Sequence, residues 1–222
     1  MNVEQILGIS ADKLLQSGAE TLYMVCFSLL MGAAIAFPTA VLIYVTRKGG
    51  LYPNRLIHGL LNVIINIIRS TPFIIMLVCV MPFTKSLVGT RIGTKAALVP
   101  LTIYIAPYLA RLMEGALLET GEGILEAAKS MGATPLQIIV HFVFPEALGS
   151  IILTIATGTI GLIGATAMAG YIGGGGIGNL ALTYGYQRFN NRLMFFTVLI
   201  LIIVVQIIQY TGSTLSQRIK RK

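Results

Sequence analysis

Long stretches without charge alternate with short polar segments along this chain. Residues 21–46 and 193–217 contain no Asp, Glu, Lys or Arg, and each is long enough to cross a bilayer alone. A bilayer core of about 30 Å needs about 20 apolar residues in a helix. Residues 70–84, 96–110 and 147–187 are also free of charge, and the last of these continues into a glycine-rich segment.

The pattern predicts an all-α integral membrane protein of one domain, residues 1–222. Two of its helices reach spanning length only if they continue past Arg69 and Arg111, whose side chains would snorkel or face a polar interior. Proline in Arg69-Ser70-Thr71-Pro72 predicts that the second helix is kinked or restarted there. We expect five spans, at about residues 18–46, 56–84, 94–118, 147–169 and 192–216.

Small residues dominate the expected fourth span. Of the 24 residues from Ala147 to Gly170, 15 are Gly, Ala, Ser or Thr, and glycine recurs at positions 158, 161 and 164. Small side chains let membrane helices approach closely, so we expect this helix to be central. Thr159 lies among these residues and either packs on a neighbouring helix, which we favour, or contacts a solute. In the second span, Asn62 and Asn66 share one face, which either lines a pathway or bonds to a neighbouring helix.

Residues 119–146 form a polar connection between the third and fourth spans. Ile124, Ala127, Ala128 and Met131 fall at i, i+3, i+4 and i+7, which predicts an apolar stripe on a short helix. Such a stripe enters a shallow cleft on another protein, or it lies on the membrane or on its own neighbours. Its geometry leaves these alternatives open.

Capping signals divide this connection into two helices. Gly132 is placed to end the first helix in the left-handed conformation. Thr134 follows as an N-cap, with Pro135 at the first helical position and Gln137 completing a capping box. We expect the second helix to run to about Phe144 and to end at Pro145. The segment 119–146 is therefore expected to be a helix-turn-helix.

The mean hydropathy is +0.84 and only 11% of the residues are charged, with a formal net charge of +8. If the chain has five spans, eight basic residues lie on one side of the membrane and six on the other. This bias indicates that the positive charge sets the orientation in the membrane and does not serve nucleic-acid binding. We expect the N-terminus outside, the C-terminus inside and residues 119–146 in the cytoplasm. The cytoplasmic set is Arg47, Lys48, Arg55, Lys129, Arg218, Lys220, Arg221 and Lys222.

Catalytic chemistry finds little support. His58 and His141 lack further ligands at metal spacing, so no metal site is expected. Cys26 and Cys79 lie in apolar spans and are expected to be buried packing residues. Arg111 and Glu114, three residues apart on a helix, are expected to pair with each other.

The segment Gly173–Gly178 fits the spacing G-x-G-x-x-G, but it lacks the strand-helix setting of a dinucleotide site. No Gly-Lys-Ser/Thr sequence occurs, so the chain is not expected to bind or hydrolyse ATP. We expect a mobile turn that closes the fourth span near the outer face. The residues that follow it are a candidate surface for a solute-binding protein: Tyr184, Tyr186, Gln187 and Arg188.

The run Glu126-Ala127-Ala128, followed by Gly132 and by a hydrophobic helix up to Pro145, resembles the coupling-loop signature of permease subunits of bacterial ABC importers. Phe142-Val143-Phe144 stands where that family usually has Ile-x-Leu, which is an apolar exchange. Roughly residues 40–190 resemble the methionine-importer permeases in particular. The segments that carry this resemblance include Arg69–Ile75, Met131–Pro135 and Tyr184–Tyr186.

The resemblance implies a transport subunit without its own ATPase site. Two copies of this chain would pair in the bacterial inner membrane with two ATPase subunits and an extracytoplasmic methionine-binding protein. The helix around Glu126, Ala127, Ala128 and Gly132 would dock in a groove of the ATPase, and Met168 would form part of a gate. L-methionine is the expected solute, with the D-enantiomer and close derivatives as further candidates.

Three alternatives remain. The first is an ABC permease for another amino acid. The second is an ion-coupled secondary transporter, which requires an acidic residue in mid-span. Glu20, Glu114 and Glu146 all lie near the expected span ends, which argues against it. The third is a membrane enzyme, which requires a metal or nucleophile constellation.

Overall fold

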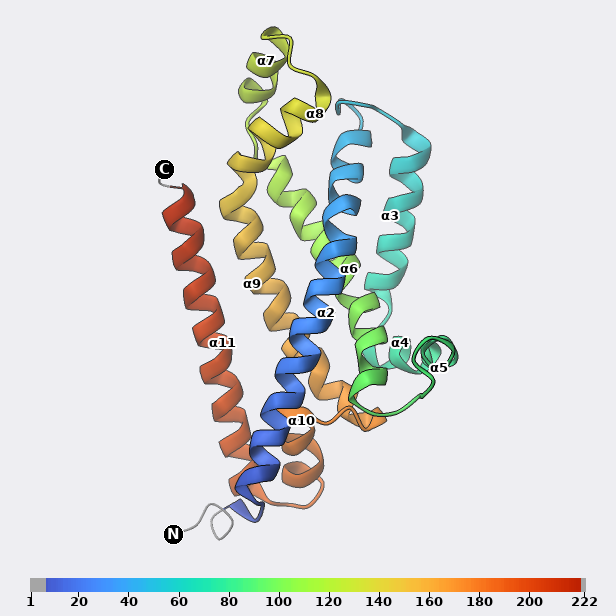
Figure 1. Ribbon diagram of the computed structural model, residues 1–222, viewed down its shortest axis with the longest axis vertical. Coiled ribbons are helices and arrows are strands. Elements are labelled where there is room, and N and C mark those ends of the chain that lie inside the picture. Colours follow the sequence, from blue (N-terminus) through green and yellow to red (C-terminus); the bar gives the residue numbers. More distant parts are fainter. Residues whose placement is uncertain (1–6, 221–222) are drawn as a thin grey trace.

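The computed structural model describes residues 7–220, except for the side chain of Glu122, and this part of the chain is helical without a β-strand (Figure 1). In chain order the α-helices are α2 (Ala11–Thr46), α3 (Arg55–Ser70), α4 (Phe73–Cys79), α5 (Met81–Val88), α6 (Thr94–Leu118), α7 (Glu122–Ser130), α8 (Pro135–Gln137), α9 (Phe144–Ala169), α10 (Gly176–Asn179) and α11 (Asn191–Lys220). Two π-helical segments, Ile138–Val143 and Leu180–Tyr186, and a 3₁₀ turn, Gly170–Ile172, complete them.

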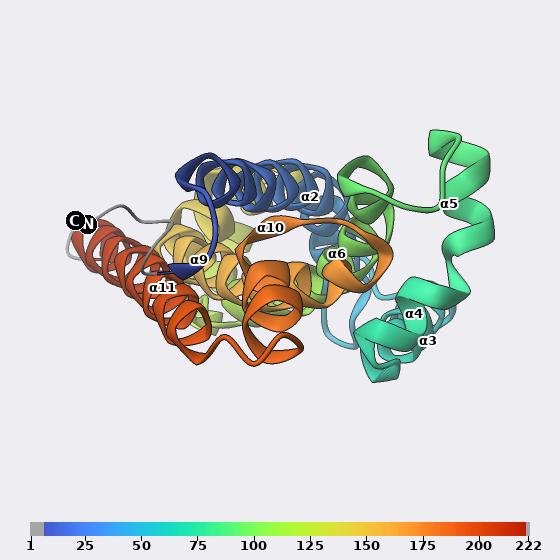
Figure 2. The ribbon, with the colours of Figure 1, turned by 90° about the horizontal axis from the view of Figure 1, so that it is seen from below.

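Four helical stretches within this range are long and apolar enough to cross a membrane, namely α2, α6, α11 and the unbroken stretch Pro135–Ile172, which includes α8 and α9. The expected second span is not one helix, because α3 and α4 are bent by 104° at the break between them. Thr71 has an extended backbone, which is the conformation that a following proline favours, so the restart expected at Pro72 is confirmed. Beyond the bend, α4 and α5 turn away to one side of the bundle (Figure 2).

The core is formed where α6 packs between α2 and α9. Leu101, Ile105 and Leu109 of α6 have no exposed surface. Glycines on both neighbours let the backbones come close: a Cβ at Gly32 would lie 2.3 Å from Ile105 Cγ2, and a Cβ at Gly158 would lie 2.4 Å from Leu109 Cδ2. The small residues of α9 therefore serve close packing, as expected.

The glycine stripe of α9 is nevertheless divided. Gly158 packs within the chain, whereas a Cβ at Gly161 would meet only Tyr108 at 4.0 Å and one at Gly164 would meet nothing within 4 Å. On the other side of α9, a Cβ at Gly212 of α11 would lie 2.4 Å from the Cβ of Ala156. Gly161 and Gly164 thus face away from the core of this chain.

The ends of the bundle differ. The helices α7 and α8 and the C-terminal end of α11 lie together at one end, and the start of α2 and α10 lie at the other (Figure 1). The expectation that Cys26 and Cys79 are buried is wrong, because both are exposed on the surface of the single chain. Apolar side chains on the outside of a membrane helix are stable against lipid, so an apolar setting in the sequence did not imply burial.

Candidate functional site

The turn between α7 and α8 has the geometry that its sequence predicts. Gly132 has φ +74°, the left-handed conformation that glycine adopts without strain. Its N–H donates to the Lys129 carbonyl at 3.0 Å, and the Ala133 N–H donates to the Ala128 carbonyl at 3.1 Å. These two bonds form a Schellman motif, which satisfies carbonyls at the end of α7.

The start of α8 carries the expected capping box. Thr134 Oγ1 accepts from the Gln137 N–H at 3.4 Å, and Gln137 Oε1 accepts from the Thr134 N–H at 2.8 Å. Pro135 occupies the first turn, where its missing N–H costs nothing. Both sides of the turn are therefore held by local hydrogen bonds.

The expectation that the second helix ends at Pro145 is wrong. The chain is helical without a break from Pro135 to Ile172. Its π-helical segment ends at Val143, two residues before the proline, and the Phe144 N–H donates to the Ile139 carbonyl, five residues back. The wider π-turn makes room for a proline ring that would clash in a regular helix interior, so Pro145 lies in the first turn of α9 instead of ending the helix.

The apolar stripe of α7 has two different edges. Ala128 has no exposed surface and packs in the chain's own core with Ile138 and Val143. Glu126 and Ala127 are exposed, and 66% of Met131 is accessible. The stripe therefore fixes α7 to its own chain along one edge and presents the other edge to the surroundings.

Leu136, of which 72% is exposed beside the turn, is not among the residues predicted from the sequence. Together with Met131 it places two large apolar side chains at the tip of the loop. Contiguous exposed apolar side chains mark sites of protein or membrane contact. The sequence signal for the exposure of Leu136 was its place in the first turn of a capped helix, where an apolar residue need not face the core.

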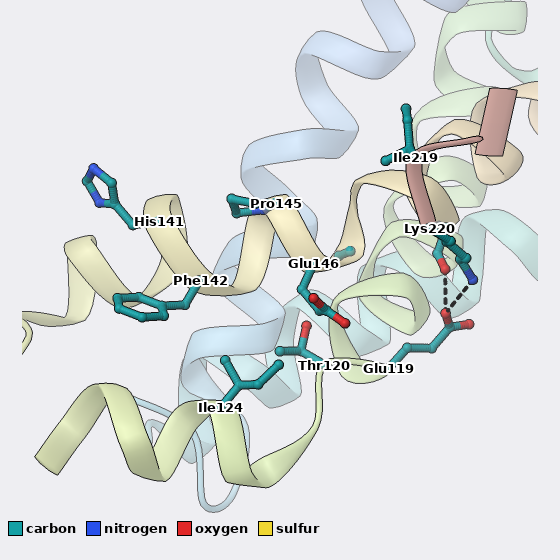
Figure 3. Close-up of a pocket in the computed structure, with 11 residues that line it drawn as sticks. Glu119, Thr120, Ile124, His141, Phe142, Pro145, Glu146, Ile219 and Lys220 are labelled. Atoms are coloured by element: carbon teal, nitrogen blue, oxygen red, sulfur yellow. Dashed lines mark hydrogen bonds and ion pairs between the residues drawn. The ribbon is translucent and has the colours of Figure 1, made fainter. Parts of the chain in front are cut away.

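A cleft of about 560 Å³ lies at the base of the loop, between α7, α9 and the end of α11 (Figure 3). In it the Glu119 carboxylate accepts a hydrogen bond from the Ser150 hydroxyl and lies 3.6 Å from Lys220 Nζ. These contacts join the ends of α6, α9 and α11, which are far apart in the sequence. Sequence periodicity carried no signal for them.

The candidate pathway residues lie on two helices. Met168 is 44% exposed near the end of α9, and Asn66 is exposed on α3. Thr159 is partly buried, and its hydroxyl donates to the Ile155 carbonyl at 2.8 Å, within its own helix. That bond accounts for the Thr159 hydroxyl without a solute.

Asn62 and Arg111 connect α3 to α6. Arg111 pairs with Glu114, as expected, and also donates to the Asn62 side-chain carbonyl. Only 6% of Glu114 is exposed, and a charge buried in a span is stable only when it is paired. Asn62 therefore serves a contact between helices, whereas Asn66 on the same face stays on the surface.

The glycine-rich segment, expected to be a mobile turn, is hydrogen-bonded to α2. The Gly176 N–H donates to the Glu20 carboxylate at 2.8 Å, and the Ile177 N–H donates to Thr21 Oγ1 at 2.8 Å. Gly175 has φ +74°, and a Cβ there would lie 2.0 Å from Glu20 Oε2. Glycine is required here for a contact within the chain, not for a nucleotide.

The segment after α10 belongs to the same end of the molecule. Tyr184 and Tyr186 lie in the π-helical segment, and the Arg188 guanidinium lies 4.3 Å from the centre of the Tyr184 ring. Tyr186 is 66% exposed. This segment therefore exposes an aromatic side chain beside an arginine.

Comparison with known proteins gives consistent results. The chain is 44% identical over 220 residues to a Vibrio cholerae protein named probable D-methionine transport system permease protein MetI, covering 99% of this chain and 98% of that one. It is 41% identical over 203 residues to the Bacillus subtilis methionine import system permease protein MetP, covering 91% of each.

A solved chain of the MetNI methionine ABC transporter, in inward-facing conformations, superposes with a TM-score of 0.91 at 41% identity, covering 94% of this chain and 97% of that chain. Residues 32–221 match the family described as binding-protein-dependent transport system inner membrane component. Family membership is thus supported by sequence and by fold over nearly the whole chain. The chain belongs to the family of binding-protein-dependent transport system inner membrane components.

Proposed function

We propose that this chain is the membrane-spanning subunit of an ATP-driven importer of methionine. The observation that carries the proposal is the capped loop of α7 and α8, which projects at one end of the bundle and exposes Glu126, Ala127 and Met131 (Figure 1). Relatives that are 41–44% identical over at least 91% of their length are named methionine permeases, which supports the solute.

The loop is where the chain receives its energy. The sequence has no phosphate-binding Gly-Lys-Ser/Thr, so ATP is bound and hydrolysed by a separate ATPase subunit that docks on the surface around Glu126, Ala127 and Gly132. Because the chain is helical without a break from Pro135 to Ile172, displacement of the loop passes directly into α9. The chain then switches between inward- and outward-open arrangements as a rigid-body movement biased by nucleotide binding.

Two copies of the chain form the pathway between them. Met168 and Asn66 are exposed in the single chain, which supports a pathway against a partner copy rather than inside one bundle. Gly161 and Gly164 face away from the chain's own core and offer a close approach to the second copy. Met168 is assigned to the gate, with Asn66 and Thr159 as further pathway residues.

We infer five spans, with α3 and α4 as one bent span, and an orientation in which the N-terminus lies outside and the loop and the C-terminus lie in the cytoplasm. This is supported by the shared position of α7, α8 and the end of α11, opposite the start of α2 (Figure 1). The extracytoplasmic face then carries Tyr184, Tyr186 and Arg188, which receive a methionine-binding protein.

An ABC permease for another amino acid is the second candidate. An ion-coupled transporter is disfavoured, since Glu114, which is buried, is already neutralised by Arg111.

Reconstitution of the chain with its ATPase and binding protein in liposomes tests the proposal. We expect ATP-dependent uptake of methionine that is abolished by Glu126→Lys, while the variant still inserts and assembles its membrane part. Lys85→Glu is the matched charge reversal, because Lys85 is exposed on α5, away from the loop (Figure 1), and it should leave uptake unchanged. Uptake driven by a proton or sodium gradient without the ATPase would overturn the mechanism, and saturable uptake of another amino acid in place of methionine would overturn the solute.

A further inference from the structure

A groove runs along the outside of α2 and α6 from the end of the bundle that holds the start of α2. Its outer part, of about 560 Å³, is lined by Gln16, Glu20 and Tyr23 of α2 and by Thr94 and Lys95 of α6. Most of the exposed lining is apolar, but it carries one acidic and one basic side chain, Glu20 and Lys95. These two charged residues stand on different helices, one on each wall.

One turn further along the same two helices the lining holds no charged side chain. This inner part, of about 390 Å³, is lined by Phe27, Met31 and Ile35 of α2 and by Leu98 and Ile103 of α6, with α5 as its third wall. Tyr23 of the outer part and Phe27 of the inner part lie with ring centroids 4.7 Å apart, so the two parts meet at this pair. The two charged side chains therefore lie at one end of these neighbouring hollows, and the other end carries none.

The length of the groove matches one leaflet of a membrane. Glu20 and Ile35 are 15 residues apart on α2, and at 1.5 Å per residue this is about 22 Å. A bilayer with its head groups is about 40–45 Å thick, so one leaflet is about half of that. A molecule with a charged head and an apolar tail of this length fits the groove end to end.

We propose that this groove binds one phospholipid, with an ethanolamine head group at the end that carries Glu20 and Lys95. The acyl chain lies along Phe27, Met31 and Ile35. The head group carries an ammonium and a phosphate, which match Glu20 and Lys95 on the two walls. Glu20 accepts from the Gly176 N–H and from Gln16 Nε2, and a carboxylate has room for about four such bonds, so it can still receive the ammonium.

A second copy of the chain fits this groove less well. Membrane helices associate through small residues that let their backbones approach. The groove instead presents large side chains, and Met31 and Ile35 are each 53% exposed. The small-residue face of the chain is elsewhere, at Gly161 and Gly164 of α9. A flexible acyl chain packs against these bulky side chains better than a second helix does.

Native mass spectrometry of the chain assembled with its ATPase, released from nanodiscs of phosphatidylethanolamine or phosphatidylglycerol, tests the proposal. We expect one retained lipid per copy, with phosphatidylethanolamine held at least about fivefold better than phosphatidylglycerol. Met31→Trp fills the apolar part and should lower retention at least about fivefold. Ile203→Trp on α11, at a site 50% exposed outside the groove lining, is the matched control and should retain lipid like the parent.

Lys95→Gln should remove the preference between the two head groups, and Lys85→Gln, outside the lining, should keep it. Thermal unfolding in lipid-free detergent confirms that each variant is folded. Equal retention in Met31→Trp and Ile203→Trp would overturn the site, and equal retention of the two lipids by the parent would overturn its head group. Disulfide cross-linking of Met31→Cys to the second copy, with Cys26 and Cys79 replaced by serine, would also overturn it, because the groove would then hold protein.

Discussion

Replacement of Gly158 by alanine should destabilise the chain, because α6 and α9 touch at this residue. A Cβ here would lie 2.4 Å from Leu109 Cδ2 and 3.3 Å from its Cγ. Leu109 has no exposed surface, so its side chain cannot move without displacing its neighbours. Overpacking of this kind costs about 1–3 kcal/mol. Alanine in place of a helical glycine offsets about 1 kcal/mol of that cost, so we expect a net loss of about 0–2 kcal/mol.

The control is Gly115→Ala on α6. Gly115 is exposed, and a Cβ there would meet nothing within 4 Å. Only the helix-propensity gain remains at this position, so stability should rise by up to about 1 kcal/mol. The free energies of unfolding of the two variants should therefore differ by about 1–3 kcal/mol, measured by denaturation of the assembled complex in detergent.

A double-mutant cycle assigns the effect to one contact. Leu109→Ala alone opens a cavity and should cost about 2–5 kcal/mol. Combined with Gly158→Ala it should cost less than the sum of the two, because the added Cβ then has space. Additive losses, or a Gly158→Ala variant as stable as Gly115→Ala, would refute the close contact between these helices.

Three further predictions concern the loop and the buried pair. Thr134→Ala removes the N-cap and should weaken the start of α8 by about 1 kcal/mol, which hydrogen exchange of the Gln137 and Ile138 amides detects as roughly fivefold faster exchange. Gly132→Ala forces alanine into the left-handed conformation and should cost about 1–2 kcal/mol, seen as faster exchange in α7. Arg111→Met leaves Glu114 buried and unpaired and should cost about 3–5 kcal/mol in thermal unfolding, whereas the double variant with Glu114→Gln should recover part of that loss.

Local chemistry made much of this chain predictable. The caps at Gly132 and Thr134 depend on residues within five positions of each other, as does the pair Arg111–Glu114. The restart at Pro72 is likewise a property of a proline and the residue before it. The same rule failed at Pro145, because the π-turn that accommodates the ring has no sequence signature that separates it from a regular helix.

Contacts between distant residues could not be predicted. Asn62 bonds to Arg111, Glu20 to Gly176 and Ser150 to Glu119, in each case between separate helices. Hydrophobic periodicity says which face of a helix is apolar but not which neighbour covers it. For the same reason it grouped Ala128 with Ala127, although the first packs on its own chain and only the second is exposed.

The loop is joined to α9 by the chain itself on one side and by a hydrogen bond on the other, and this decides how the loop acts in the proposed importer. On one side α7 continues through the capped turn into the unbroken helical stretch Pro135–Ile172. On the other side Glu119, just before α7, is bonded to Ser150 of α9 and paired with Lys220 of α11. Force applied to α7 therefore reaches α9 through the chain and through the Glu119–Ser150 bond. Through Glu119 it also reaches the adjoining ends of α6 and α11. Met168 is 23 residues beyond Pro145, about 35 Å along the helix, so a tilt of about 10° at the loop would shift Met168 by about 6 Å. A small docking movement is thus large enough at the far end to open or close a gate, provided that α9 stays rigid between the two.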